Sequence, residues 1–400
     1  MRTLSEAGHE AVFAGGCVRD AIMGIAPKDY DIATSADPST IMALFPRCIP
    51  VGLQFGVVRV LDEDRVYEVA TFRADHGYTD GRRPDSVSWS TARDDVLRRD
   101  FTVNGLLQDP LAPSEPGGEG IGGAIIDHVG GRDDIHAGII RAIGDPYARF
   151  AEDKLRLLRA LRFSARFDFQ IEPHTWAAIA AHAQDIAEVS VERVTQELSR
   201  LLTEGGAARG LELLDASGLG RRILPEVPSL SRARQRFIGV GPISDELGYV
   251  SLMLDAAALP EGAEDLGRRH RLSTALARRI GEAVAIVRAL TGWPALTVAA
   301  RMRYLRSPAA ETAFAAAEMA ARAGQLDAAS WAAVQSDRQR YADVDLNPPR
   351  LLGGRELIAA GHRPGPRFQQ VLDAVEDAQL EGRITTRAEA EALAESLLAG

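Results

Sequence analysis

The sequence has very little cysteine and very little lysine. Only Cys17 and Cys48 occur among 400 residues, which excludes a disulfide framework and a cysteine-rich zinc site. We therefore expect a reducing, cytoplasmic environment. Lysine occurs only at Lys28 and Lys154, so 44 of the 46 basic residues are arginine. We attribute this imbalance to the base composition of the genome, and composition alone locates no binding site.

Long apolar runs and a net positive charge are absent as well. No stretch approaches the roughly 20 apolar residues that a membrane-spanning helix needs. The early apolar run, residues 11–18, is interrupted by two glycines and followed at once by Arg19 and Asp20, unlike a secretory signal. The net charge is −10, whereas proteins that coat nucleic acid without selectivity are usually basic. We expect no membrane partner, and any contact with nucleic acid must come from local arginine clusters.

The first 110 residues show mixed helix and strand patterns. Short apolar or β-rich runs predict four strands, two of them in a hairpin, and Pro38 predicts the start of a helix through Phe45. The four predicted strands cover residues 11–14, 30–33, 57–61 and 66–72. Residues 73–89 are polar and contain Gly and Pro, so we interpret them as a long loop that helps the site change its substrate. A second loop is expected over residues 110–123.

From Pro146 onward the pattern is helical, with apolar residues at a spacing of 3.6. The clearest examples are residues 150–163, 191–202 and 207–214. Arginine is concentrated in three stretches of this part, over residues 221–236, 268–271 and 278–279. Such stretches indicate either a solvated helix face or contact with an RNA backbone.

Asp29-Tyr30-Asp31 is the first candidate for chemistry. On a strand, residues i and i+2 point to the same face, so the two carboxylates repel each other unless a cation lies between them. Magnesium takes carboxylate oxygens together with substrate phosphates. A pair of ions held in this way suits in-line displacement at phosphorus. The alternative is a solvent-facing strand.

A phosphate-binding turn precedes this pair. Gly15 and Gly16 permit a tight turn, and the helix that follows offers free N–H groups to a phosphate. Arg19 on its first turn adds a bidentate donor, and Arg98 and Arg99 would also suit a triphosphate. A plain turn and a surface pair of arginines are the alternatives.

A third pattern, with a spacing of three, begins at Glu152 and Asp153 and continues through Arg156, Arg159 and Arg162. On one helix this spacing gives a ridge of neighbouring side chains. One aspartate acceptor beside one arginine donor matches the Watson–Crick edge of cytosine or adenine and mismatches guanine and uracil. Asp153 and Arg156 are thus candidates for reading the base. The alternative is an exposed row of ion pairs worth a few tenths of a kcal/mol each.

Taken in order, these motifs resemble those of class II tRNA nucleotidyltransferases, the CCA-adding enzymes, and of the related bacterial poly(A) polymerases. The matching stretches are GGCVRDAIMG (15–24), KDYDIAT (28–34), YEVATFR (67–73), RRDFTVNGL (98–106), AEDKLRLLRALRFSARF (151–167) and, near the C-terminus, residues 351–393. Residues 240–340 match no motif of the family.

The resemblance implies an α+β fold with a polymerase-β-like nucleotidyltransferase head, followed by helical parts. It implies a catalytic head over 1–140, a neck with the nucleotide-selecting helix over 141–220, a body over 221–340 and a tRNA-binding tail over 341–400.

The resemblance also implies the site residues. Asp29 and Asp31 would be catalytic and hold Mg²⁺, with Glu68 as a third carboxylate. Nucleotide-binding positions would be Gly16, Arg19, Arg99, Asp153, Arg156, Arg159 and Arg162. The implied reaction adds C, C and A to the 3′ end of tRNA from CTP and ATP. No protein partner is inferred.

Two other functions are compatible with part of this sequence evidence. A poly(A) polymerase or an A-only tRNA-finishing enzyme would use the same chemistry. Against the former, residues 50–58 resemble the strand of CCA-adding enzymes, and the C-terminus lacks a basic tail. A non-catalytic RNA-binding protein on the same scaffold would usually have lost a metal-binding carboxylate, whereas Asp29 and Asp31 are both present.

Overall fold

A computed structural model describes residues 1–400 apart from residue 64, residues 78–84, 115–119 and 256–260, and residues 364 and 400. The chain forms two compact units. The first contains Met1–Pro225 with Ile238–Ile243, and the second contains Glu226–Phe237 with Ser244–Gly400. The finer division into head, neck, body and tail remains a prediction. No described helix combines the length and the apolar character needed to cross a membrane.

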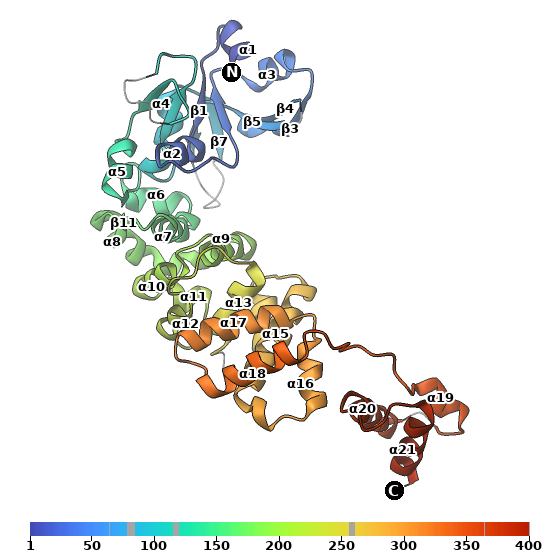
Figure 1. Ribbon diagram of the computed structural model, residues 1–400. Coiled ribbons are helices and arrows are strands. Elements are labelled where there is room, and N and C mark those ends of the chain that lie inside the picture. Colours follow the sequence, from blue (N-terminus) through green and yellow to red (C-terminus); the bar gives the residue numbers. More distant parts are fainter. Residues whose placement is uncertain (64, 78–84, 115–119, 256–260, 364, 400) are drawn as a thin grey trace. The chain divides into compact units, whose positions relative to one another are not determined.

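The N-terminal part of the first unit is built on a seven-stranded sheet with the order β3-β4-β5-β2-β1-β8-β9 (Figure 1). The strands are β1 (Ala11–Ala14), β2 (Asp31–Thr34), β3 (Cys48–Gly52), β4 (Val57–Asp62), β5 (Arg65–Thr71), β8 (Leu106–Asp109) and β9 (Ala124–Asp127). Within the described residues of this sheet, β2 and β5 pair in parallel and the other neighbouring strands pair antiparallel. The helices here are α1 (Arg2–Glu6), α2 (Gly16–Ile22), α3 (Pro38–Leu44), α4 (Ala92–Leu97) and α5 (Gly131–Ala137), with short 3-10 turns at Leu53–Phe55 and Thr102–Asn104.

Both faces of this sheet are covered because its central strands are apolar on both sides. One core contains Leu4, Ile32 and Ile41, which come from α1, β2 and α3. The opposite core contains Val12 and Val96, from β1 and α4. Because the faces of the sheet are covered, the polar residues of the candidate site lie where strands begin or end.

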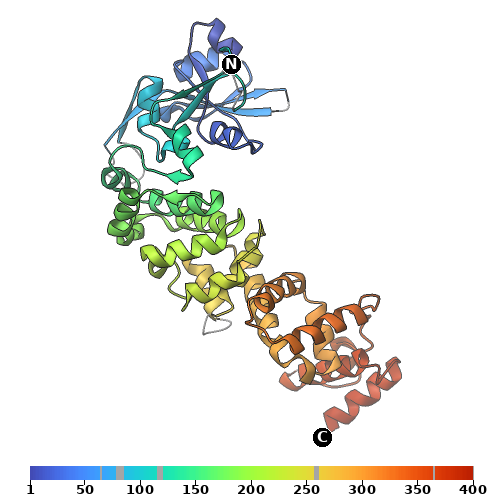
Figure 2. The ribbon, with the colours of Figure 1, turned by 60° about the vertical axis from the view of Figure 1, so that its left-hand side comes forward.

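From Pro146 onward the described part of the chain is mainly helical (Figure 2). In the first unit they are α6 (Pro146–Glu152), α7 (Leu155–Phe167), α8 (Pro173–His182), α9 (Val191–Thr203), α10 (Ala207–Ser217) and α11 (Leu219–Ile223), with a 3-10 turn at Ala183–Glu188. In the second they are α12 (Leu230–Arg236), α13 (Asp245–Met253), α14 (Glu261–Arg269), α15 (Thr274–Ala289), α16 (Val298–Leu305), α17 (Ala310–Arg322), α18 (Ala328–Arg340), α19 (Gly354–Ala359), α20 (Pro366–Leu380) and α21 (Arg387–Ala399), with a 3-10 turn at Leu290–Ala295. Two short strands, β10 (Ile139–Ile140) and β11 (Gln170–Ile171), pair in parallel beside α7. This mixed sheet followed by helices confirms the predicted α+β fold.

Three sequence predictions about local structure need correction. Residues 73–89 are not one long loop, because β6 (Arg73–His76) and β7 (Ser86–Trp89) pair as an antiparallel hairpin. Residues 78–84 of that predicted loop, and residues 115–119 of the second one, lie outside the described residues. The predicted helix over 150–163 is divided into α6 and α7 at Asp153 and Lys154.

The third correction concerns the arginine-rich stretches. Arg236 is neither solvated nor available to RNA, because it is only 2% exposed. Its guanidinium donates to the Ser251 carbonyl and to the Asp255 carboxylate, both at 2.7 Å. Elsewhere in these stretches, the exposed Arg279 pairs with Glu246 at 2.6 Å. Helical periodicity alone did not reveal which arginines are structural.

Candidate active site

The two predicted metal-binding carboxylates lie at the start of β2. Asp31 is the first residue of this strand, whereas Asp29 precedes it, so the prediction that both lie on the strand was wrong. The strand begins where Asp31 meets Glu68 of β5 in the parallel register. The pKa of Asp31 is raised, first by loss of hydration and then by the negative charges of Asp29 and Glu68, while Arg99 opposes the shift. The three carboxylates therefore lie close enough to repel one another.

Glu68 has a protein partner on its other side. Arg59 of β4 donates to one Glu68 carboxylate oxygen through Nε at 3.0 Å and Nη2 at 2.8 Å. Both side chains are about half exposed, so this ion pair is of the kind that contributes little to stability. Within the described part of the chain, no cluster of three or more His, Cys, Asp or Glu side chains is arranged to hold a metal. The role of Glu68 as a third metal ligand stays a prediction.

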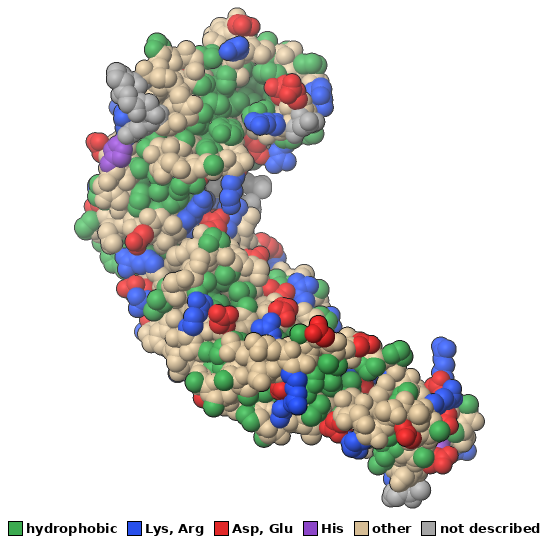
Figure 3. All heavy atoms as spheres, in the orientation of Figure 1, with side chains coloured by type: hydrophobic (Ala, Val, Ile, Leu, Met, Phe, Trp, Pro, Cys, Tyr) green, Lys and Arg blue, Asp and Glu red, His purple; other side chains and the backbone are tan. Residues whose placement is uncertain are grey.

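Asp31 faces a polar cavity of about 460 Å³ in the first unit. The cavity is lined by Gly15, Gly16, Arg19, Asp31, Arg98, Arg99, Asp100, Asn104, Asp153, Arg156, Arg159, Arg162, Phe163, Arg166, Arg200 and Glu204. Eight of these residues are arginines and four are carboxylates, so the cavity has an excess of positive charge. Basic and acidic side chains gather in the hollow beside the sheet-containing part (Figure 3). An excess of guanidinium groups is what a triphosphate requires.

The turn between β1 and α2 forms one wall of this cavity. Gly15 has a φ of 73°, and a Cβ at this position would lie 2.6 Å from Nη1 of Arg99. Glycine is needed here both for the backbone conformation and for the approach of that guanidinium. Both glycines were predicted to form this turn, with Gly16 as a nucleotide-binding position; Gly16 lines the cavity and has ordinary spacing around it. Arg19, on α2, lies with its guanidinium 4.7 Å from the centre of the Phe167 ring of α7.

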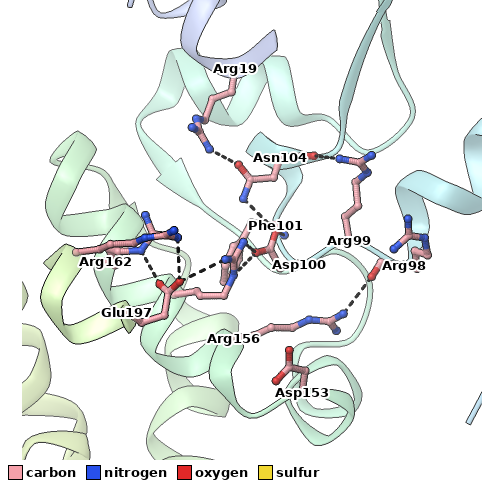
Figure 4. A network of polar contacts seen from close by, with 12 residues as sticks. Arg19, Arg98, Arg99, Asp100, Phe101, Asn104, Asp153, Arg156, Arg162 and Glu197 are labelled. Carbon is pink, nitrogen blue, oxygen red and sulfur yellow. Dashed lines mark hydrogen bonds and ion pairs between the residues drawn. The ribbon is translucent and has the colours of Figure 1, made fainter. Parts of the chain in front are cut away.

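Asp100 is the centre of the polar network in Figure 4. It accepts hydrogen bonds from the Phe101 N–H at 2.8 Å, from Asn104 Nδ2 at 3.0 Å, and from Arg159 Nε and Nη2 at 2.8 and 2.6 Å. Asn104 also accepts a hydrogen bond from Arg19. Burial alone would raise the pKa of Asp100, but the charge of Arg159 and the hydrogen bonds outweigh burial and hold this pKa far below its usual value.

The motif that contains Asp100 predicted a role only for its arginines, Arg98 and Arg99. Asp100 and Asn104 connect residues of the sheet-containing part to α7, and they were missed because nothing in the motif shows which partner each takes. One indication of their importance was present in the sequence: both are polar and lie in the same short motif as Arg98, Arg99 and the apolar Phe101.

Replacing Asp100 with asparagine is expected to lower the free energy of unfolding by about 3 kcal/mol near neutral pH, because Arg159 loses its carboxylate partner. The folded-state pKa lies below the unfolded value of 3.8, so the stabilisation is present above that value and is lost as the pH falls below about 4. Urea unfolding of wild type and variant as a function of pH measures the difference. The exposed Asp133→Asn is the control. A constant difference across this pH range would contradict the assignment.

The proposed base-reading residues are brought to the cavity, but not on one helix. Asp153 has an extended backbone, with φ −145° and ψ 103°, at the end of α6, and its Oδ1 accepts from the Leu155 N–H at 3.1 Å. An aspartate that bonds to a nearby N–H competes with helix formation, which explains the break. Arg156 lies on α7 and donates to the Glu152 carboxylate at 2.8 Å and to the Arg98 carbonyl at 3.1 Å. No hydrogen bond between the Asp153 and Arg156 side chains is found in the described part of the chain; Figure 4 shows them beside each other.

The remaining two arginines of this pattern are held by α9. Arg162 Nε donates to Glu197 at 2.5 Å, and its Nη1 lies 3.3 Å from Glu204. Arg159 lies 3.6 Å from the same Glu197 in addition to its pair with Asp100. Both arginines line the cavity. Because Glu197 is buried, these contacts fix the positions of the guanidinium groups before any substrate binds.

Comparison with known proteins identifies the family. Residues 11–141 match the family described as "Poly A polymerase head domain", and residues 168–230 match "Probable RNA and SrmB- binding site of polymerase A". A CCA-adding enzyme of Limosilactobacillus fermentum is 35% identical over 394 residues, covering 96% of this chain and 92% of its own. A CCA-adding enzyme of Bacillus velezensis is 32% identical over 396 residues, covering 97% and 94%.

Comparison with solved structures supports the same family. The crystal structure of the Bacillus stearothermophilus CCA-adding enzyme in complex with CTP has a TM-score of 0.76 and 32% identity, and the match covers 99% of this chain and 95% of the other. The Thermotoga maritima CCA-adding enzyme complexed with tRNA is 20% identical with a TM-score of 0.67, which is a likeness of fold. Identity above 30% over nearly the whole length of both chains shows that this chain belongs to the family of CCA-adding enzymes.

Proposed function

We propose that this chain adds C, C and A to the 3′ end of tRNA from CTP and ATP, without a nucleic-acid template. The observation that carries the proposal is the arginine-lined cavity beside Asp31 in a chain of this family. The terminal 3′-hydroxyl of the tRNA attacks the α-phosphorus of the nucleotide. An oxygen–phosphorus bond forms, the bond to the bridging oxygen breaks, pyrophosphate leaves, and the hydroxyl proton is released.

The arginines of the cavity hold the triphosphate. Arg19 and Arg99 line the cavity beside the turn that Gly15 and Gly16 form. Their guanidinium groups give paired hydrogen bonds to phosphate oxygens and offset the negative charge of the triphosphate. The same charges stabilise the pyrophosphate as it leaves.

Asp29 and Asp31 hold magnesium in this proposal. Two neighbouring carboxylates that repel each other fit a divalent cation, and Mg²⁺ is bound in proteins by one or two carboxylates together with substrate phosphates. When bound, the ion lowers the pKa of the attacking hydroxyl and stabilises charge on the leaving oxygens. The proposal also places the enzyme in the cytoplasm, supported by the near absence of cysteine.

In this proposal, Asp153 and Arg156 select the base. The Asp153 carboxylate accepts from the amino group of cytosine or adenine, and Arg156 donates to the adjacent ring nitrogen. Uracil and guanine present a carbonyl oxygen to Asp153 and an N–H to Arg156. Such a mismatch leaves buried polar groups unpaired and discriminates strongly.

The purified chain is expected to extend a tRNA that ends before CCA. With CTP alone it should add two residues, and with CTP and ATP three, as the addition of C, C and A requires. Product length on a sequencing gel measures this, with a tRNA that already carries CCA as the control. Addition of A alone to tRNA ending in CC would instead indicate an A-only finishing enzyme. Long A tails would indicate a poly(A) polymerase.

A further inference from the structure

We infer that Arg193 of α9 fixes the orientation of the Asp153 carboxylate and so contributes to the choice of C and A over U and G. This inference rests on the proposed function, because it requires that Asp153 reads the base. Arg193 lies 40 residues after Asp153 in the sequence, and its Nη2 donates to Asp153 Oδ2 at 2.7 Å. The two side chains are only 20% and 15% exposed, so solvent screens this ion pair less than it would a surface pair.

The Asp153 carboxylate is held from two sides. Its Oδ1 accepts from the Leu155 N–H at 3.1 Å, while its Oδ2 accepts from Arg193. An ionised carboxylate has about four acceptor positions, so acceptor capacity remains for the amino group of a base. The backbone contact fixes one oxygen, and Arg193 fixes the rotation of the whole group.

Loss of Arg193 would change what Asp153 offers to a base. A carboxylate that rotates away from the base removes the mismatch with the carbonyl oxygen of uracil or guanine. The hydrogen bond from Arg193 opposes this rotation. It therefore preserves the penalty against the wrong bases.

The donor half of the reading pair does not depend on Arg193. Arg156 is held by the Glu152 carboxylate, the Arg149 carbonyl and the Arg98 carbonyl, at 2.8, 3.0 and 3.1 Å. Removing Arg193 therefore disturbs the acceptor half alone. Arg193 is a positioning residue, since it acts on the base through Asp153.

The test compares Arg193→Met with wild type as full-length chains, using tRNA that ends before CCA and each of the four nucleotides in turn. The kcat/KM for CTP relative to UTP is expected to fall at least about tenfold, which corresponds to about 1.4 kcal/mol. On tRNA ending in CC, the ratio for ATP over GTP should fall similarly. Arg193→Lys should recover part of both ratios, because an ammonium group still donates to the carboxylate but without the fixed geometry of a guanidinium.

Arg209→Met is the matched control, because Arg209 lies on the neighbouring helix α10, outside the residues that line the cavity, and pairs with Glu212. Adding Arg193→Met to Asp153→Ala should cost no further selectivity, since the two act as one unit. Equal loss for all four nucleotides, or unchanged ratios in a folded variant, would overturn the inference. If Arg193→Met does not fold, Arg193→Lys decides: unchanged ratios in this variant, or a loss of selectivity that is equally large in the Asp153→Ala background, would overturn the inference. Failure of wild type to add C would overturn the proposed function itself.

Discussion

Asp31→Asn is expected to abolish the addition of both C and A while leaving the chain folded. The substitution removes one of the two carboxylates proposed to hold magnesium, and Asp29→Asn should act in the same way. A bound metal supplies several kcal/mol of transition-state stabilisation, so a loss of about 10³-fold or more in kcat is expected. Because C and A addition share one set of phosphate-binding and metal-binding groups, the two steps should fall together.

The fold should survive because Asp31 is a source of repulsion in the chain without a metal. Its neighbours Asp29 and Glu68 carry the same charge, and asparagine keeps the shape of the side chain while removing the charge. Thermal unfolding should therefore give a midpoint equal to that of wild type or slightly higher. Isothermal titration with Mg²⁺ and CTP measures binding apart from turnover. A folded variant that turns over near the wild-type rate would refute the metal assignment.

The fold of the sheet-containing part was largely predictable because its elements carry local signals. The β4–β5 hairpin follows from apolar runs separated by acidic residues, and α3 follows from Pro38 behind its capping residue Asp37. The β6–β7 hairpin was missed because its strands are short and polar. Their pairing depends on a register between Arg73 and Trp89 that no local periodicity encodes.

The break between α6 and α7 was missed for a related reason. The apolar spacing of 3.6 continues across it, so the pattern predicts one helix. What divides the two helices is the hydrogen bond from the Leu155 N–H to the Asp153 side chain. This bond places Asp153 at the end of one helix and Arg156 on the next.

The sequence named residues that line the cavity but not the partners that hold them, and the predicted Asp29 and Glu68 are not among the lining residues. The predicted residues Gly16, Arg19, Asp31, Arg99, Asp153, Arg156, Arg159 and Arg162 all line the cavity. Arg193 and Glu197 could not be predicted, because nothing local distinguishes them from solvated charges, although Glu197 is buried on α9. Tertiary packing alone makes Glu197 a buried partner of Arg162.

Exchanging the proposed base-reading groups is expected to exchange the base preference. With Asp153→Arg plus Arg156→Asp, donors would face the carbonyl oxygens of G and U, and the acceptor would face their ring N–H groups. Each wrong base buries unpaired groups at roughly 1–3 kcal/mol apiece, so relative incorporation should shift toward G and U by about 10-fold to 100-fold. The quantity to measure is the ratio of incorporation among the four nucleotides rather than the rate.

The surroundings of the pair predict how active the exchanged chain will be. The new guanidinium would face Arg193, and the new carboxylate would lie near Glu152, so like charges would meet on both sides. The double variant should therefore be slow. Adding Arg193→Glu should raise its rate without reversing its preference, because a carboxylate at that position can hold the exchanged guanidinium as Arg193 holds Asp153. An active exchanged chain that still prefers C and A would show that shape or the RNA end sets the specificity, and would leave Asp153 as the partner of Arg193 alone.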